Sequence, residues 1–349
     1  MVMFFALPRE LRDMIYTEVI LYSHPRPLLG HPQWRTFRFR RVEYAQSSVT
    51  GEFGCAYSLE CTPTTCANLL CCNRQVNREM LEVMRLIKKT DSSSDGSNDE
   101  GDALAARIDV IAEDESFHYF TFLSVPLVKT TPVVYDGKSR ILPAFINDWM
   151  STYLAWPHRW LCSGTLAAKT STSRIEKLII DIRLAGDRTR KWTRNNNQSD
   201  RTSWAVCAAL KRLMENGPDL SSSSTFYTPP PSSLSTAPTT MRTPPRITIG
   251  HLVLNVVPPP SSSAVKFLPR HAQPNEVREG MVHPQSVASE LLDVWAKIWR
   301  GTEYKGVLYQ SLLEGVDGVE VCVDGASVGI RPLGKELRRG RRGRDVRGG

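Results

Sequence analysis

The residues in this sequence best suited to chemistry are five closely spaced cysteines: Cys55, Cys61, Cys66, Cys71 and Cys72. Four thiolates can enclose a tetrahedral zinc ion, so this group is a candidate metal site. The spacing lacks the short Cys-x2-Cys pairs that bring two sulfurs to one ion, and Cys72 falls on the apolar side of an expected helix, where cysteine acts as a small hydrophobe. We therefore predict no metal here, and zinc is the alternative.

No residue pattern predicts catalysis or cofactor binding. None of the seven histidines belongs to a His-Glu-x-x-His pair. The sequence contains neither a Gly-x-Ser-x-Gly elbow nor a phosphate-binding glycine loop. The members of a Ser, His and Asp triad need not be close in sequence. A hydrolase or metalloenzyme without a recognisable motif is therefore kept as a third hypothesis, after the two binding hypotheses introduced below. We predict no catalytic residue and no cofactor.

The arginines near the C-terminal end are a second group with potential chemistry. Residues 335–349 contain seven Lys or Arg and two Asp or Glu, so they carry +5 of the formal net charge of +8. Such a segment can bind RNA phosphates, stack on bases or act as a nuclear-import signal. A disordered solubilising terminus explains it equally well. The arginines that would contact RNA or an import receptor are Arg338, Arg339, Arg341, Arg342 and Arg344.

Composition places the chain among soluble globular proteins. It is 41% hydrophobic and 23% charged. No stretch approaches the roughly 18 apolar residues of a membrane span, and the apolar N-terminus lacks the basic region of a secretory leader. We therefore expect reduced thiols, no membrane contact and an intracellular location, in the cytoplasm or the nucleus.

The apolar spacing near the N-terminus predicts an amphipathic docking helix. Pro8 suits a first helical turn, where its missing N–H costs no hydrogen bond. Leu7, Leu11, Ile15 and Val19 recur at helical spacing and form one apolar stripe, which Met14 and Tyr22 extend. The positions expected to stay on the polar side are Arg9, Glu10, Arg12 and Asp13.

A second helix is predicted from Leu69 onward. Its apolar positions recur every three or four residues, which is typical of a helix with one buried face. We expect this stripe to pack against the stripe of the first helix, with Arg74, Arg78, Glu79 and Glu82 largely on other faces. The apolar positions are Leu69, Cys72, Val76, Met80, Val83 and Ile87.

The two helices carry the motifs of a known family. The pattern Leu-Pro-x-Glu-Leu-x-x-x-Ile-Tyr begins at Leu7, and Leu-Leu-x-x-x-Arg-Gln-Val-x-x-Glu begins at Leu69. Together they resemble the F-box-like domain of many filamentous-fungal proteins, over residues 4–90. They also resemble the related fungal family named for two Glu-x-Arg turns: Glu10-Leu11-Arg12 matches the first turn, whereas the later position reads Gln75-Val76-Asn77.

The resemblance implies a non-catalytic adaptor for protein–protein interaction. In such a protein the N-terminal helices contact the Skp-family adaptor of a cullin-type ubiquitin ligase, and the rest of the chain recruits a client protein. The alternative is that the same side chains only pack the helices onto the remaining fold. The residues implied in partner binding are Leu7, Pro8, Leu11, Ile15, Leu69, Leu70 and Val76.

Later residues predict an α+β or α/β body. Three apolar strands within 178–184, 252–257 and 319–323 are separated by amphipathic helices, a β-α-β-α-β order that favours a mixed, partly parallel sheet. Further strands are expected at 108–112 and 117–125, and helices at 142–156, 202–216 and 286–300.

The domain division follows from these patterns. Within 23–66, aromatic residues alternating with arginines predict a strand or hairpin with one aromatic face, and nucleic-acid stacking is the alternative. We expect the following ranges: helical region 1–90 with a long insert at 23–66, acidic disordered loop 91–102, body 103–334 with a disordered Pro/Ser-rich insertion at 218–246, and basic disordered tail 335–349.

Overall fold

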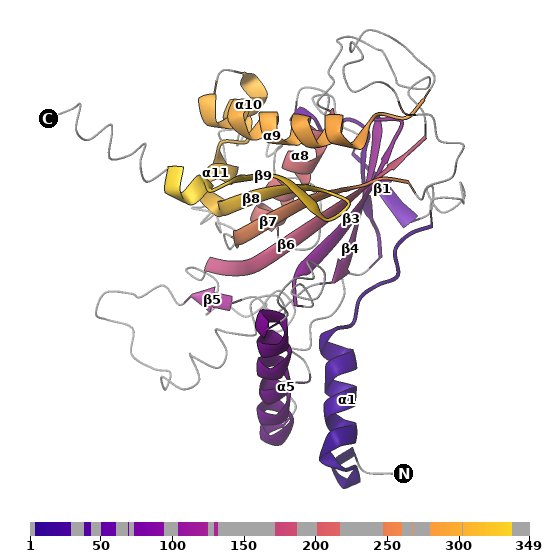
Figure 1. The fold of residues 1–349 in the computed structure, drawn as a ribbon, viewed down its shortest axis with the longest axis vertical. Coiled ribbons are helices and arrows are strands. Elements are labelled where there is room, and N and C mark those ends of the chain that lie inside the picture. Colours follow the sequence, from indigo (N-terminus) through magenta and orange to yellow (C-terminus); the bar gives the residue numbers. More distant parts are fainter. Residues whose placement is uncertain are drawn as a thin grey trace, which may run out of the picture.

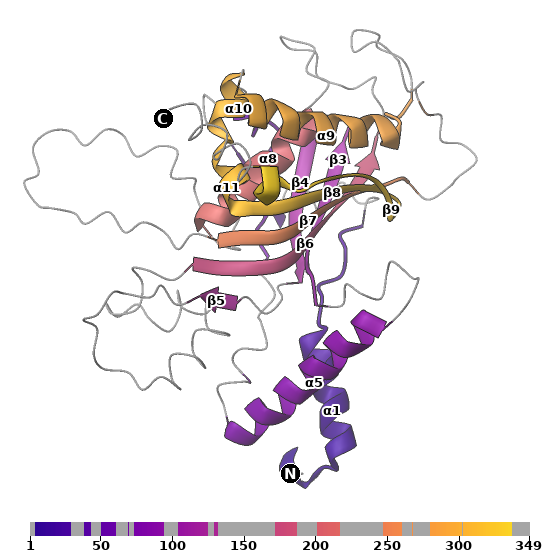
Figure 2. The same ribbon diagram turned by 60° about the vertical axis from the view of Figure 1, so that its left-hand side comes forward.

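The fold is a mixed β-sheet with helices on one side and a projecting helix pair on the other (Figures 1 and 2). The computed structural model describes residues 4–28, 38–42, 50–60, 69, 73–93, 104–124, 129–131, 172–186, 201–216, 247–259, 267, 280–301 and 303–336. Within these ranges the sheet has nine strands in the order β1-β2-β4-β3-β6-β7-β8-β9, and β5 pairs beside β6. This arrangement confirms α+β, one of the two predicted classes, and the mixed, partly parallel sheet.

The helices and strands of the described residues have the following bounds. The strands are β1 Phe39–Arg41, β2 Cys55–Ser58, β3 Ala106–Glu113, β4 Phe117–Ser124, β5 Lys129–Thr131, β6 Thr172–Ala185, β7 Ile247–Val257, β8 Val316–Val323 and β9 Ala326–Arg331. The helices are η1 Phe4–Ala6, α1 Arg9–Ile20, α5 Arg74–Ser93, α8 Arg201–Asn216, α9 Pro284–Arg300, α10 Tyr304–Leu308 and α11 Ser311–Gly315. None of the helices in the described ranges is long and apolar enough to span a membrane.

Four parallel strands form the centre of the sheet. The strands β3, β6, β7 and β8 are parallel neighbours, and Leu178, Leu252 and Val319 lie in register across the last three. In sequence α8 lies between β6 and β7, and α9 between β7 and β8. The predicted β-α-β-α-β order is therefore confirmed.

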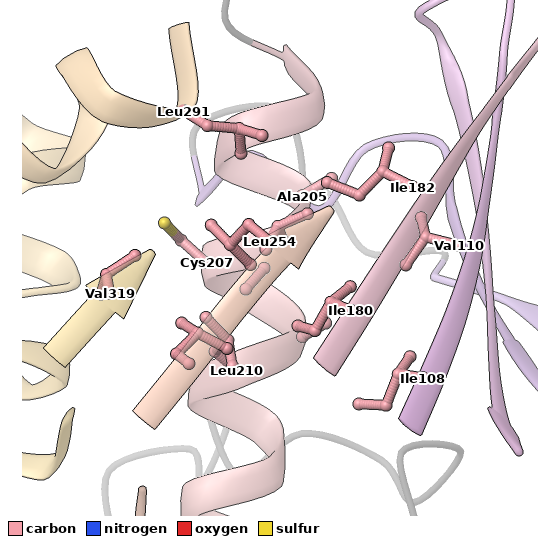
Figure 3. Packing of buried hydrophobic residues seen from close by; sticks show 14 of the residues in the cluster. Ile108, Val110, Ile180, Ile182, Ala205, Cys207, Leu210, Leu254, Leu291 and Val319 are labelled. Carbon is pink, nitrogen blue, oxygen red and sulfur yellow. The ribbon is translucent and has the colours of Figure 1, made fainter. Parts of the chain in front are cut away.

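The main hydrophobic core lies between these strands and the helices α8 and α9 (Figure 3). Ile180 and Ile182 point from β6 toward Ala205 and Leu210 of α8, and all four side chains are buried. The helix α9 begins because His283 Nδ1 accepts a hydrogen bond from the Gln285 backbone N–H at 3.2 Å. It ends at Gly301, whose left-handed conformation (φ 61°) favours glycine.

The opposite face of the sheet has a polar network at its centre. Arg183 of β6 donates from Nε to Asp109 Oδ1 of β3 at 2.7 Å, and Asn255 of β7 donates to Asp181 at 2.9 Å. Burial is the main cause of the raised pKa of Asp109. Arg26, in the segment that follows α1, forms an ion pair with Asp181. This contact attaches the N-terminal segment to the sheet.

The insert at 23–66 contributes two strands to one edge of the sheet. The strand β1 pairs with β2, and β2 pairs with β4. Phe39 is buried and contacts Tyr119 edge to face, with ring centroids 5.3 Å apart, whereas Arg40 and Arg41 are exposed. The predicted strand with one aromatic face is therefore confirmed at Phe39.

Other predicted segments end differently or lie outside the described residues. The helix α5 continues to Ser93, so the first residues of the expected acidic loop are helical. The strand β9 was not predicted, although Ala326, Val328 and Ile330 alternate with polar residues or glycine; these three apolar side chains are exposed in the structure. The expected helix at 142–156, the insertion at 218–246 and residues 337–349 of the basic tail lie outside the described residues.

Candidate functional site

The helices α1 and α5 form a pair that projects from the sheet, on the side opposite α9 (Figures 1 and 2). Pro8 precedes α1, and its carbonyl accepts a hydrogen bond from the Arg12 N–H at 3.3 Å. At the start of α5, Asn73 Oδ1 accepts from the Gln75 backbone N–H at 2.8 Å, a contact typical of a helix N-cap. The N-terminal start of each helix is therefore specified by its local sequence.

A small apolar core holds the two helices together. It is formed by Tyr16 of α1 and by Val76, Met80, Val83 and Met84 of α5, all of which are buried. The side chains of Phe4, Val19, Ile20, Leu81 and Ile87 pack against this core. The Phe4 and Tyr16 rings meet edge to face with centroids 5.7 Å apart, so η1 also covers the pair.

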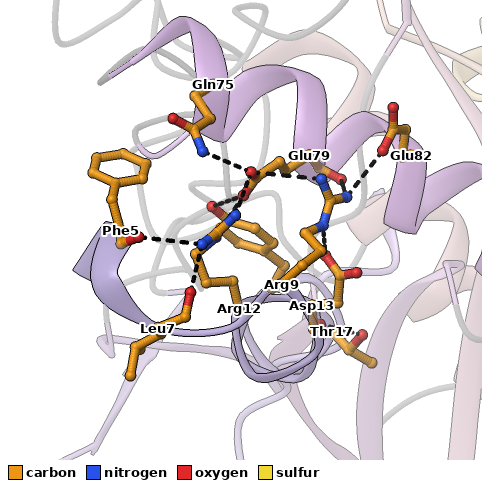
Figure 4. A network of polar contacts seen from close by, with 10 residues as sticks. Phe5, Leu7, Arg9, Arg12, Asp13, Thr17, Gln75, Glu79 and Glu82 are labelled. Atoms are coloured by element: carbon orange, nitrogen blue, oxygen red, sulfur yellow. Dashed lines mark hydrogen bonds and ion pairs between the residues drawn. The ribbon is translucent and has the colours of Figure 1, made fainter.

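A buried ion pair lies beside this core (Figure 4). Arg12 donates two hydrogen bonds to Glu79, from Nη2 to Oε1 at 2.8 Å and from Nε to Oε2 at 3.0 Å. Tyr16 Oη donates to Glu79 Oε2 at 3.0 Å, and Gln75 Nε2 donates to Oε1 at 2.9 Å. The Arg12 Nη1 group donates to the Leu7 carbonyl at 2.6 Å. Each polar group of this cluster thus has a partner, as a buried charge requires.

The same contacts shift the acid–base properties of the cluster. Hydrogen bonds from Arg12 are the main cause that lowers the pKa of Glu79 to about 2. Burial, followed by the hydrogen bond to Glu79, raises the pKa of Tyr16 to about 12. Glu79 is therefore a carboxylate and Tyr16 a neutral phenol near pH 7, so the charges of Arg12 and Glu79 cancel within this cluster.

Arg9 adds a more exposed bridge between the helices. Its Nε donates to Asp13 Oδ1 at 2.7 Å, and its Nη2 donates to Glu82 Oε2 of α5 at 3.0 Å. Both arginines of α1 are thus turned toward carboxylates of α5 (Figure 4). This pairing fixes the rotation of α1 about its own axis.

The predicted packing of the two apolar stripes is wrong for α1. The buried residues of α1 are Arg12 and Tyr16, whereas Leu11, Met14 and Ile15 are 45%, 65% and 42% exposed. Glu79 was expected on another face of its helix, but it is buried. The reason is that Arg12 and Glu79 neutralise and hydrogen-bond each other, so both can be buried. Apolar periodicity within one helix cannot indicate a charged partner far away in sequence. For α5 the predicted inward positions Val76, Met80 and Val83 are confirmed.

Some of the residues predicted to bind a partner are exposed in the structure, and others are not. Leu11, Ile15, Pro8 and Leu69 are exposed, and Leu7 is partly buried. Val76 is only 6% exposed and belongs to the core of the pair, so it is not an accessible contact residue. Leu70 lies outside the described residues. The accessible part of the predicted set is therefore on α1 and at Leu69.

Metal binding finds no support in the described part of the chain. It contains no group of three or more His, Cys, Asp or Glu side chains that could hold an ion. Cys55 is a buried free thiol whose pKa is raised by burial. The other four cysteines of the zinc hypothesis lie outside the described residues, so zinc binding there stays untested.

One buried histidine is held in its neutral form. The His118 Nε2 atom lies 3.0 Å from Thr202 Oγ1, and burial lowers the pKa of the ring to about 3. Only 1% of the residue is exposed, so substrate cannot reach it in this conformation. We assign it to the packing of α8 against β4.

Comparison with protein-family models, curated proteins and solved structures finds no match to this chain.

Analysis of apolar spacing missed the buried ion pair of Arg12 and Glu79, although the positions of the two residues in their motifs could have indicated it. Arg12 ends the Glu10-Leu11-Arg12 turn, and Glu79 ends the motif that begins at Leu69. Polar residues at the ends of two separate motifs could have suggested the ion pair between them.

Proposed function

We propose that the α1 and α5 pair is the docking unit of a non-catalytic, F-box-like adaptor. In this proposal α1 contacts the Skp-family adaptor of a cullin-type ubiquitin ligase, and the sheet with its helices recruits a client protein. The observation that supports it is the exposed apolar face of α1, formed by Leu11, Met14 and Ile15, on a helix whose other face is already packed.

The geometry of this face suits recognition by a partner groove. Positions i, i+3 and i+4 of a helix lie on one side and are the usual anchors of helix-in-groove binding. The Arg12 and Glu79 contacts hold α1 in place before binding, which reduces the entropy lost on association. An ordered apolar surface of this kind is typical of a protein-binding site rather than of a catalytic one.

Calorimetric titration of a purified Skp-family adaptor into the full chain tests the proposal. Wild-type protein is expected to bind, and Leu11→Ala with Ile15→Ala to weaken binding roughly tenfold or more, because two interface anchors are lost. The control variant is Val328→Ala with Ile330→Ala, which removes two exposed apolar side chains from β9. A wild-type chain that does not bind the adaptor, or equal losses in both variants, would refute the proposal.

The alternative of a nuclear or RNA-associated protein depends on Arg338 to Arg344. These arginines lie outside the described residues, so this alternative stays a sequence prediction. No described contact favours a hydrolase or metalloenzyme over an adaptor.

A further inference from the structure

The outer face of α5 carries three exposed arginines. Arg74, Arg78 and Arg85 are spaced by four and seven residues, so they follow one side of the helix over about 16 Å. The buried residues Val76, Met80 and Val83 lie on the other side, against α1. The three arginines, hereafter the α5 arginine stripe, therefore point away from the helix pair.

Pairing between the helices leaves this stripe without neutralising carboxylates. Glu79 forms an ion pair with Arg12, and Glu82 forms one with Arg9. Within the described part of the chain, no hydrogen bond or ion pair is formed by Arg74, Arg78 or Arg85. Glu82, which is half-exposed beside the stripe, is already paired with Arg9 of α1, so the three arginines are not neutralised by a carboxylate of α5.

We infer that the α5 arginine stripe binds an acidic protein surface, next to the site of the apolar contact on α1. This inference rests on the proposed function and adds the charge of the partner surface to it. A guanidinium group presents paired donors that match carboxylate oxygens, and arginine is enriched in protein interfaces. Complementary charge of this kind mainly increases the association rate.

A nucleic acid fits the same stripe less well. Three arginines would contact few phosphates, and the exposed residues beside them include Gln75 and Glu82 rather than aromatic side chains on which bases stack. The exposed apolar side chains of the helix pair also favour a protein partner.

Binding kinetics of the purified Skp-family adaptor at several salt concentrations test the inference. In the full chain, Arg78→Glu with Arg85→Glu is expected to lower the association rate about tenfold at low ionic strength. The difference should shrink as salt screens the charges. The control is Arg300→Glu, a single charge reversal at an exposed arginine of α9, which should leave the rate within about twofold of wild type.

The outcomes separate this inference from the proposed function. Wild-type binding with the expected loss in the α5 variant and none in the Arg300→Glu control supports both. Wild-type binding that the α5 variant leaves unchanged overturns the acidic-surface inference and leaves the docking proposal intact. A wild-type chain that does not bind the adaptor overturns both. If the variant keeps adaptor binding and loses affinity for a DNA or RNA duplex, the stripe belongs to a nucleic-acid site and the inference fails.

Discussion

At the scale of single residues, the contact between Arg12 and Glu79 determines which side of α1 faces outward. Both carboxylate oxygens of Glu79 accept hydrogen bonds from Arg12, and Tyr16 and Gln75 complete the shell. Removing one member of a buried pair leaves the other charge unpaired, which is more destabilising than never having buried the pair. The orientation of the apolar face of α1 therefore depends on a polar contact.

Acid titration of Glu79 should loosen the helix pair. The pKa of Glu79 is about 2 in the folded protein, against an ordinary value of 4.5. A lowered carboxyl pKa stabilises the folded state above about pH 4.5, and this contribution is lost as pH falls from 4.5 through 2. We expect the hydrogen-exchange protection factors of α1 amides to be constant between pH 7 and 5 and to fall below pH 4.5.

Two variants make this titration specific. Glu79→Gln should reduce α1 protection at pH 7 and remove most of its dependence on acid. Glu82→Gln alters the half-exposed bridge to Arg9 and should keep the wild-type profile. A wild-type profile that already declines between pH 7 and 5, or one that Glu79→Gln leaves unchanged, would contradict the role assigned to Glu79.

At the scale of elements, α1 has one face packed against α5 and one face exposed to solvent. The helix pair has a methionine in each environment. Met80 of α5 is fully buried in the core of the pair, and Met14 of α1 is 65% exposed. The same substitution at both positions therefore compares the stability contribution of a buried side chain with that of an exposed one.

Met80→Ala should destabilise the helix pair by about 2–5 kcal/mol, because it leaves a cavity in a closed core. Met14→Ala should change the stability by no more than about 0.5 kcal/mol, because its side chain is mostly in water. Native-state hydrogen exchange of α1 and α5 amides measures both free energies. Similar costs for the two variants would show that the open face of α1 is packed in solution.

Much of the fold could be predicted from sequence because periodicity reports burial. The strands β6 and β7 alternate apolar residues, and α8 and α9 have apolar stripes, so all four elements were found. The helices were found near their observed bounds, whereas β6 and β7 begin at Thr172 and Ile247, six and five residues before the predicted apolar segments. The rotation of α1 could not be predicted, since its strongest apolar stripe is the one left in water. The polar networks around Glu79 and Asp109 also join residues far apart in sequence, which local patterns do not reveal.

At the scale of the whole molecule, the sheet positions the helix pair through the segment that follows α1. The His24 backbone N–H donates to the Leu123 carbonyl at 2.7 Å, and Arg26 pairs with Asp181 in the middle of β6. Arg183 donates to the Pro27 carbonyl at 2.8 Å. These contacts join the segment to β4 and β6, so the sheet can serve as a platform from which α1 and α5 project (Figure 1).

The central claim is that α1 is the surface that meets the partner. Hydrogen exchange of the full chain, measured with and without a purified Skp-family adaptor, tests it most directly. The account predicts slower exchange within Arg9–Ile20 in the complex and unchanged exchange in the central strands β6 and β7. A complex in which α1 exchanges as fast as in the free protein, with protection confined to the sheet, would contradict it.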